Sequence, residues 1–389
     1  MSGRVAKCVS MANAMPVVDA AHRWPQDVMM SAPGWSNAVA LQTYSNWTKV
    51  WVSWQLLQGN LSGPPASASA MWADLNTAPN GLSYIRQLDE QIADMNRRGV
   101  FVNLGIYHEY PTWANGATGA ESDPSFGSPP HHVSTTKFPN DVSAYSWWGL
   151  FVAFLCLRYG AGITVSSGAP NLGNPSGAYV NALEILNEPN FHNWPQACAP
   201  GIVANMIRTA EFWAAYVNGP ALLVAGTSDT VVTRPGWWAA QDPFHNDVLA
   251  NLSGFSPRVY MGWSGHNYGD IDDETTSRTA TFCNRINSSF WPWKHIWLTE
   301  GGWNMQTATP TSQQLADQER KVRVNYTAIN NNFPQVVLHT QHTIHDSLSG
   351  TFHAGMWEPP VLNSGGQVVT VGAARPIATT WTSSLWPKA

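Results

Sequence analysis

Charged side chains are scarce in this 389-residue sequence. Lys, Arg, Asp and Glu together make up 12% of it, and 20 basic residues face 25 acidic ones, which gives a formal net charge of −5. An average soluble domain carries about 25% charged residues. Nucleic-acid binding requires a concentrated basic patch, and anionic membrane surfaces attract the same kind of patch. We therefore expect no nucleic-acid partner.

Long apolar runs are also missing. No segment approaches the roughly 20 apolar residues that a membrane-spanning helix needs, so we expect no membrane span. The first residues lack the long apolar core of a secretory signal. The sequence therefore leaves the compartment open, and extracellular or cell-surface action would follow only from the class of substrate.

Spacings typical of metal and redox sites are absent too. The cysteines lie far apart and form no Cys-x-x-Cys pair, which favours isolated thiols, although one disulfide is possible; they are Cys8, Cys156, Cys198 and Cys283. His339, His342 and His345 share a three-residue spacing, but on an extended strand the middle one faces away from the other two. We expect neither a metal site nor a cofactor.

What the sequence does contain is an alternation of short apolar runs with amphipathic helical patterns, typical of repeated β-α units on a parallel sheet. Strands are expected near residues 5–10, 48–53, 100–106, 182–186, 222–225, 259–262, 295–299 and 336–339. Eight units without a glycine-rich nucleotide loop predict an α/β fold, the (β/α)8 TIM barrel, rather than an open doubly wound sheet. We expect one catalytic domain over residues 1–389 with long strand-to-helix loops, at 63–70, 116–139 and 166–177.

Two of the predicted strands end in a glutamate. The run 183–190 reads Leu-Glu-Ile-Leu-Asn-Glu-Pro-Asn and places Glu188 at its end, and the run 295–302 places Glu300 likewise. Chemistry in a (β/α)8 barrel lies at the carboxyl ends of the strands. Two carboxyl groups there are what glycosidic bond cleavage needs, one as acid and one as nucleophile or stabilising charge. A single strand-terminal glutamate is often only a salt-bridge partner; the pairing favours catalysis over the rivals Glu109 and Glu184.

Two motifs resemble the catalytic signature of clan A of the retaining glycoside hydrolases: Asn187-Glu188-Pro189 after the fourth strand, and Glu300 after the seventh. Within the clan, they are most similar to the cellulase-like and the xylosidase/iduronidase-like families. The resemblance implies that Glu188 is the acid/base and Glu300 the nucleophile. It further implies that Asn187 bonds the sugar 2-hydroxyl and that Tyr268, in His266-Asn267-Tyr268, hydrogen-bonds the nucleophile. His266 is expected two residues away on the same strand face, at the barrel mouth.

Further substrate contacts are expected around the rim. His108 follows the third strand, where a hydroxyl contact and a structural histidine are equally consistent with the sequence. The sequence holds 21 Trp, and flat indole faces stack on sugars. Candidates just beyond strands are Trp54, Trp113, Trp194, Trp263, Trp303 and Trp357, and about half of them are expected to be packing residues. Trp357 resembles the clan's tryptophan that lies beneath the central sugar ring of the substrate.

One departure from the clan is visible. Many members carry an arginine on the second strand near the nucleophile, whereas the nearest basic residue here is Lys49, which lacks the fixed fork of donors. We expect a retaining β-glycoside hydrolase acting by double displacement on a polysaccharide or oligosaccharide, and endo action. The alternatives are an exo-acting β-glycosidase, or a carbohydrate-binding or structural barrel with little turnover. The sequence identifies neither the sugar nor the oligomeric state.

Overall fold

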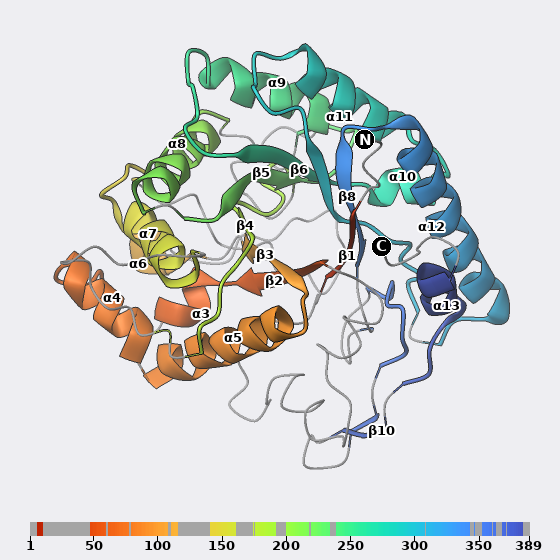
Figure 1. The fold of residues 1–389 in the computed structure, drawn as a ribbon, viewed down its shortest axis with the longest axis horizontal. Coiled ribbons are helices and arrows are strands. Elements are labelled where there is room, and N and C mark those ends of the chain that lie inside the picture. The colour runs from red at the N-terminus through yellow and green to blue at the C-terminus, as the bar shows by residue number, and fades with distance from the viewer. Residues whose placement is uncertain are drawn as a thin grey trace.

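Eight parallel strands close into a barrel in the computed structural model (Figure 1). The structure describes residues 6–10, 47–59, 61–77, 79–107, 110–115, 141–160, 174, 176–191, 200–217, 219–233, 239–307, 309–342, 346, 352–359, 361–362, 368–370 and 372–383. In order around the barrel the strands are β1 (Ala6–Ser10), β2 (Trp47–Val52), β3 (Phe101–Ile106), β4 (Ala182–Glu184), β5 (Ala221–Thr227), β6 (Met261–His266), β7 (Ile296–Glu300) and β8 (Val336–His342). β8 pairs with β1, which closes the ring.

Helices surround the barrel (Figure 1). They are α3 (Trp54–Gln58), α4 (Ala68–Thr77), α5 (Pro79–Arg97), α6 (Thr112–Asn115), α7 (Trp147–Tyr159), α8 (Pro200–Val217), α9 (Gln241–Asn251), α10 (Tyr268–Asp272), α11 (Ser277–Ser288), α12 (Ser312–Asn332) and α13 (Pro376–Ser383). A short antiparallel pair, β9 (Val361–Leu362) and β10 (Val368–Thr370), follows β8. The predicted (β/α)8 barrel is thus confirmed, while the single-domain organisation of residues 1–389 stays a prediction.

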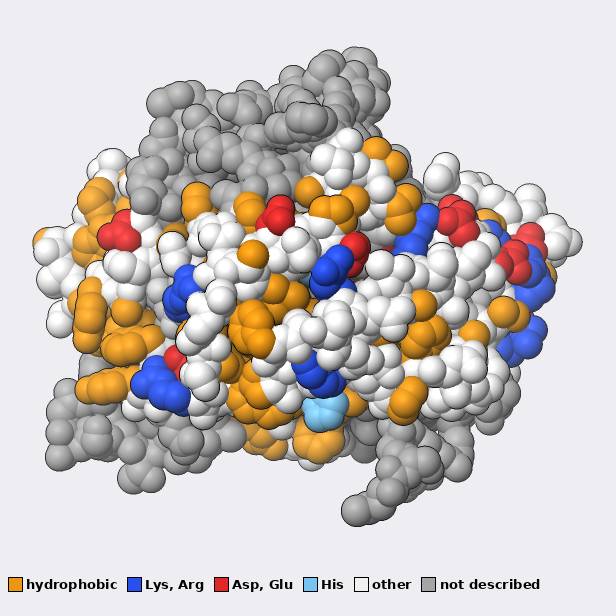
Figure 2. Space-filling model, turned by 90° about the horizontal axis from the view of Figure 1, so that it is seen from above, with side chains coloured by type: hydrophobic (Ala, Val, Ile, Leu, Met, Phe, Trp, Pro, Cys, Tyr) orange, Lys and Arg blue, Asp and Glu red, His pale blue; other side chains and the backbone are white. Residues whose placement is uncertain are grey.

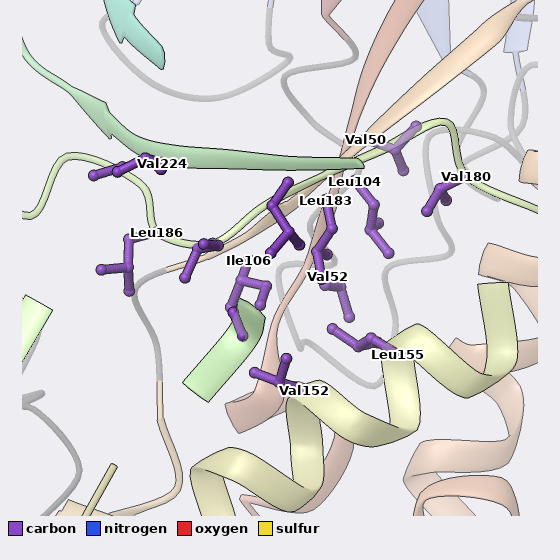
Figure 3. Close-up of a cluster of buried hydrophobic side chains, with 14 of the residues drawn as sticks. Val50, Val52, Leu104, Ile106, Val152, Leu155, Val180, Leu183, Leu186 and Val224 are labelled. Carbon is purple, nitrogen blue, oxygen red and sulfur yellow. The ribbon is translucent and has the colours of Figure 1, made fainter. Parts of the chain in front are cut away.

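The hydrophobic core lies between the strands and the helices. Side chains alternate along β2 and β3, so Val50, Val52, Leu104 and Ile106 all point outward and are completely buried. In Figure 3, Val52 and Ile106 lie next to Leu155 and Val152 of α7. Helix α7 is apolar on nearly all of its sides and buries most of its residues, as expected for a helix covered on both faces.

The inside of the barrel is polar. Lys49, Asn103, Glu184 and Thr299 come from four different strands and are almost fully buried. Glycines make room for such large groups: a Cβ on Gly226 would lie 2.1 Å from Oε1 of Glu184. The barrel therefore encloses a charged network directly under its mouth.

The structure corrects one strand. The sixth strand was expected at residues 259–262, but β6 runs from Met261 to His266, because Gly262 and Gly265 hide its strand propensity from sequence reading. Two helices begin after capping side chains. A capping box starts α12, where the Thr311 and Gln314 side chains each accept from the other's backbone N–H, and α7 begins at Trp147 after Ser146.

Surface and core agree with the composition. Figure 2 shows one face with few charged side chains scattered over uncharged surface. Within the described ranges, Cys156 and Cys283 are free, buried thiols. In the same part of the chain, no helix has both the length and the hydrophobicity needed to cross a membrane.

Candidate active site

Glu188 is positioned by strained backbone. The chain stays extended beyond β4, where Asn187 forms a bridge with Gly226, and the Glu188 N–H donates to the Gly226 carbonyl at 2.7 Å. Glu188 itself has φ of 44°, a left-handed conformation that is uncommon for a non-glycine residue and that clusters at functional sites. The result is a carboxyl group whose side chain is 16% exposed at the barrel mouth.

Glu300 is the last residue of β7, and each of its carboxylate oxygens contacts a donor. Nζ of Lys49 lies 2.9 Å from Oε1, and the Tyr268 hydroxyl donates to Oε2 at 3.0 Å. Burial would raise the pKa of this carboxyl, but attraction from His266 and Lys49 outweighs burial and lowers the pKa well below its ordinary value. Glu300 is therefore a fixed, ionised carboxylate at neutral pH.

One imidazole ring joins the two glutamates. Nδ1 of His266 is hydrogen-bonded to Oε1 of Glu188 at 2.9 Å, and Nε2 lies 3.3 Å from Oε1 of Glu300. Burial lowers the pKa of His266, but attraction from Glu300 and the contacts with Glu188 raise it overall. A charged imidazole has a donor at each nitrogen, which fits an acceptor on either side. The structure thus brings Glu188, Glu300 and His266 to one site.

Tyr268 reaches Glu300 from a different element than expected. His266 is the last residue of β6, but Tyr268 opens α10, so the two do not share a strand face. The start of α10 is held by Asp229, whose Oδ2 accepts from the N–H groups of Gly269 and Asp270 at 2.8 and 3.2 Å. Burial, partly offset by Arg278, raises the pKa of Asp229 to about 6. Burial and the charge of Glu300 keep Tyr268 protonated by raising its pKa well above the usual value.

Lys49, the nearest basic residue in the sequence, is the cation of this site. Besides Glu300, its Nζ contacts Oε2 of Glu184 at 2.8 Å and lies 3.5 Å from Oδ1 of Asn187. The ammonium also sits 3.9 Å from the centre of the Trp51 ring, a cation–π contact. Burial lowers its pKa, but Glu184 and Glu300 raise it overall, so Lys49 stays charged.

Glu184, a rival candidate from the sequence, has a different position from Glu188. Its side chain is completely buried and accepts from Thr299 at 2.7 Å and from Asn103 at 3.2 Å. It balances the charge of Lys49 beneath the mouth and presents no exposed carboxylate oxygen. Asn187 lies between this layer and Glu188 and is 4% exposed.

The tryptophans mostly belong to the packing. Trp54 is completely buried, stacks on Phe151 with ring centres 5.1 Å apart, and bonds Gln58, so it does not rim a cleft. Trp263 is buried in the same way. Trp113 packs edge-on against Trp54 and donates to the carbonyl of Gln58.

Two tryptophans lie nearer the described mouth. Trp303 donates to Asp272 of α10 at 2.9 Å and lies under Nζ of Lys321, so its ring faces α10 and α12. Trp357 is partly buried and packs against the core, and its backbone forms an isolated β-bridge with Ala374. His108, Glu109 and Trp194 fall outside the described residues. Within that part of the chain, no group of three or more His, Cys, Asp or Glu side chains could hold a metal ion.

Sequence reasoning did not identify two aromatic residues beside Tyr268. His342 ends β8, and Phe352 follows in the loop toward α13; their rings pack against Tyr268 at 6.0 and 5.5 Å between centres. His342 had been read only as part of the histidine spacing. Its position two residues past an interior-facing Thr340 on a barrel strand is the signal that would place it at the mouth.

Comparison with known proteins bears on the fold. A structure of fungal β-1,4-galactanases matches with a TM-score of 0.54 and 13% identity, over 97% of this chain and 99% of that one. XacCel5A in complex with cellopentaose gives 0.53 and 11%, over 97% and 98%. The intracellular xylanase TsXylA of Thermoanaerobacterium saccharolyticum JW/SL-YS485 gives 0.52 and 12%, over 97% and 95%. No protein-family model and no curated protein matches the sequence.

These matches cover both chains almost end to end at low identity. They show that this chain has the barrel fold of the galactanases, XacCel5A and the xylanase, as expected for a (β/α)8 barrel. The roles of individual residues rest on the site geometry described above.

Proposed function

We propose that this chain is a retaining β-glycoside hydrolase that cleaves a polysaccharide or oligosaccharide by double displacement. The observation that carries the proposal is the single imidazole of His266 in contact with both Glu188 and Glu300. It means that the two carboxyl groups work at one site while remaining chemically unequal. Fold resemblance to a galactanase and a xylanase supports the same class of reaction.

The different surroundings of the two carboxyl groups assign their roles. Glu300 has donors on both oxygens and a lowered pKa, as a nucleophile that must stay ionised requires. Glu188 is the more exposed of the two, with 16% of its side chain exposed against 9% for Glu300, and its Oε1 is hydrogen-bonded to His266. We assign Glu188 as the acid/base and Glu300 as the nucleophile.

The reaction follows in two steps. A Glu300 oxygen attacks the anomeric carbon while the bond to the leaving oxygen breaks and Glu188 gives that oxygen its proton. Water then attacks the glycosyl-enzyme, Glu188 takes the water proton, and Glu300 leaves as carboxylate. Both displacements occur at the same carbon, so the product keeps the β configuration. We assign Asn187, whose Oδ1 lies 3.5 Å from Nζ of Lys49, to bond the sugar 2-hydroxyl, where a contact strengthens in the transition state.

We propose endo action, because fold neighbours are named for the polymers galactan and xylan and one holds cellopentaose. An exo-acting β-glycosidase has the same catalytic pair and differs only in whether the cleft is closed at one end. Product length separates the two: internal cleavage releases mixed oligosaccharides early, and exo action releases one short product throughout.

The test is hydrolysis of β-linked polysaccharides and aryl β-glycosides by wild type, Glu300→Gln and Glu188→Gln. Glu319→Gln is the matched control, because Glu319 pairs with Arg323 on the outside of α12. We expect β-configured first products by NMR, loss of turnover in Glu300→Gln, and in Glu188→Gln selective loss for substrates with poor leaving groups. Inverted products would contradict the mechanism. Sugar binding without any turnover by the wild type would establish the carbohydrate-binding alternative instead.

A further inference from the structure

Helix α10, whose first residue is Tyr268, is not capped by its own N-cap side chain. The N-cap residue is Asn267, and its side chain makes no capping hydrogen bond. It points instead toward α12 and β8, where its Nδ2 lies 2.9 Å from Oδ1 of Asn325 and 3.0 Å from Nε2 of His339. The first N–H groups of a helix have no acceptor within the helix, so those of α10 depend on another part of the chain.

Asp229 supplies the missing acceptor from the loop after β5. Its Oδ2 accepts from the N–H groups of Gly269 and Asp270, at 2.8 and 3.2 Å. These are the second and third residues of α10, the positions that an N-cap side chain normally bonds. The helix dipole also favours a negative charge there. Asp229 therefore takes the place of the N-cap side chain, although it belongs to a different β-α unit.

The capping carboxylate is buried. Asp229 is 5% exposed, and burial, partly offset by the charge of Arg278, raises its pKa to about 6. Nη1 of Arg278 comes within 3.6 Å of Oδ2 because residue 269 is a glycine, since a Cβ on Gly269 would overlap that nitrogen. A neutral side chain at residue 267 could cap the helix without burying a charge. Buried groups with a shifted pKa cluster at functional sites.

The segment that carries Asp229 is fixed to the turn that carries Glu188. Ser228 donates its N–H to Oδ1 of Asn190 at 2.9 Å, and its carbonyl accepts from Nδ2 of the same side chain at 2.9 Å. Asn190 is completely buried and lies two residues beyond Glu188. A continuous hydrogen-bonded path therefore connects the turn of Glu188, through residues 228 and 229, to the first turn of α10.

We propose that Asp229 is a positioning residue for the nucleophile, which acts by holding the Tyr268 hydroxyl on Glu300. This proposal rests on the proposed function. Tyr268 donates to Oε2 of Glu300 at 3.0 Å from the first position of α10, so a shift of this helix turn loosens the hydrogen bond. Asp229 acts through Tyr268, because its own carboxylate contacts the backbone of α10 and Arg278 rather than the reacting atoms.

The test is a double-mutant cycle between Asp229 and Tyr268. Asp229→Ala removes the acceptor, Asp229→Asn keeps an acceptor oxygen without the charge, and each is combined with Tyr268→Phe. Thr311→Ala is the matched control, because Thr311 caps α12 with an exposed side chain. kcat and KM are measured on the best substrate of the wild type. The distance from the Tyr268 hydroxyl to Oε2 of Glu300 is measured in crystals of both Asp229 variants.

We expect Asp229→Ala to lower kcat/KM by about 10-fold or more, mainly through kcat, because it loosens a hydrogen bond to the charged nucleophile. It should cause little further loss when Tyr268→Phe is already present, and in the crystal the hydroxyl should lie beyond hydrogen-bonding distance of Glu300. Asp229→Asn should fall between Asp229→Ala and wild type in activity. Thr311→Ala should lower the melting temperature and leave kcat/KM unchanged.

Equal losses of kcat/KM with and without Tyr268→Phe, or an unchanged distance of 3.0 Å in Asp229→Ala, would overturn the positioning role and leave the proposed function standing. If Asp229→Ala does not fold, Asp229→Asn decides: full activity, or a loss that Tyr268→Phe does not suppress, would overturn the role. A wild type without turnover would overturn the proposed function, and the crystal distance would then decide the positioning role by itself.

Discussion

Nζ of Lys49 lies 2.9 Å from Oε1 of Glu300, with the lysine fully buried and the glutamate side chain 9% exposed. The same ammonium contacts Glu184 at 2.8 Å on its other side. One cation thus balances two carboxylates inside the barrel, and His266, whose pKa is raised by Glu300 and Glu188 against the effect of burial, contacts both of these glutamates at the mouth. Glu300 is kept ionised by this arrangement rather than by exposure to water.

Lys49→Met should therefore be far more damaging than loss of a surface lysine. It leaves Glu184 and Glu300 buried without their cation, and breaking a buried pair costs about 3 to 5 kcal/mol. The folded pKa of Glu300 is depressed, so its contribution to stability is present above the unfolded value of 4.5 and is lost as the pH falls toward the folded value. Removing Lys49 raises the folded pKa, and the acid limb of kcat/KM should move to higher pH.

Urea unfolding at pH 7 and a pH profile of kcat/KM measure both effects. Lys49→Arg keeps the charge, so the acid limb of the kcat/KM profile should stay at the same pH, although the larger guanidinium must fit beside Trp51. Equal stability and an unshifted acid limb in Lys49→Met would contradict the charge balance described here.

Tyr268→Phe tests the second donor to the nucleophile. The change removes a hydrogen bond of 3.0 Å to Glu300 and leaves the ring against Phe352 and His342. A hydrogen bond to a charged group contributes about 1.5 to 3 kcal/mol, so kcat/KM should fall roughly 10- to 150-fold. Thermal unfolding should change little. Tyr145→Phe, at a hydroxyl on a side chain 75% exposed, is the control and should leave kcat/KM unaltered.

The barrel and the position of Glu188 and Glu300 at its mouth could be predicted because they depend on short-range patterns. Largely apolar runs such as 183–186 mark strands, and a glutamate at the end of a run marks the mouth. The sixth strand was displaced because Gly262 and Gly265 carry no strand signal. Its true end at His266 decides that the imidazole reaches both Glu188 and Glu300.

The layer beneath the mouth could not be predicted in this way. Lys49, Glu184 and Thr299 belong to three strands, and their contacts depend on the stagger of the barrel. The expectation that Trp54 rims the cleft was wrong for a related reason. Trp54 follows β2 and is the first residue of α3, but the helix turns its side chain inward, where it stacks on Phe151 of α7. Distance along the chain from a strand end does not determine which way a side chain faces.

Stability should fall in acid because of a buried neutral histidine. His245 is fully buried, and burial lowers its pKa from 6.5 to about 3. The unfolded chain therefore binds a proton that the folded chain does not in the window between these values, and each such proton reduces stability by about 1.4 kcal/mol per pH unit as the pH falls. His342 acts in the same direction. His266, with its raised pKa, changes the stability only above pH 6.5, outside this window.

The measurement is urea unfolding at several pH values between 4 and 6.5 for wild type and His245→Gln. The substitution can keep a polar contact to Thr227, which lies 2.8 Å from Nε2 of His245. His245→Gln should have a shallower loss of stability with acid, whatever its stability at pH 7. If the free energy of unfolding fell equally steeply with pH in both proteins, His245 would not be the cause of the loss of stability in acid.

Arg375 anchors the loop that carries Phe352. Its Nη2 donates to Oδ2 of Asp346 at 2.6 Å, and both side chains are essentially removed from water. Asp346 also accepts from the Gly355 N–H at 2.6 Å and is hydrogen-bonded to His353. The ion pair therefore fixes the backbone on either side of residue 354, close in sequence to Phe352.

Arg375→Met should lower the free energy of unfolding by about 3 to 5 kcal/mol, because it leaves the Asp346 carboxylate buried without its cation. The partly exposed pair of Arg323 and Glu319 on α12, with 42% and 20% of the side chains exposed, gives the comparison, and Arg323→Met should cost no more than about 1 kcal/mol. Since the loop also carries Phe352, whose ring packs against Tyr268, kcat/KM should fall in Arg375→Met under conditions where the variant is still folded. Similar losses of stability in the two variants would mean that burial of the Asp346 pair does not stabilise this loop. A normal kcat/KM in the folded Arg375→Met variant would mean that the ion pair does not control the position of Phe352.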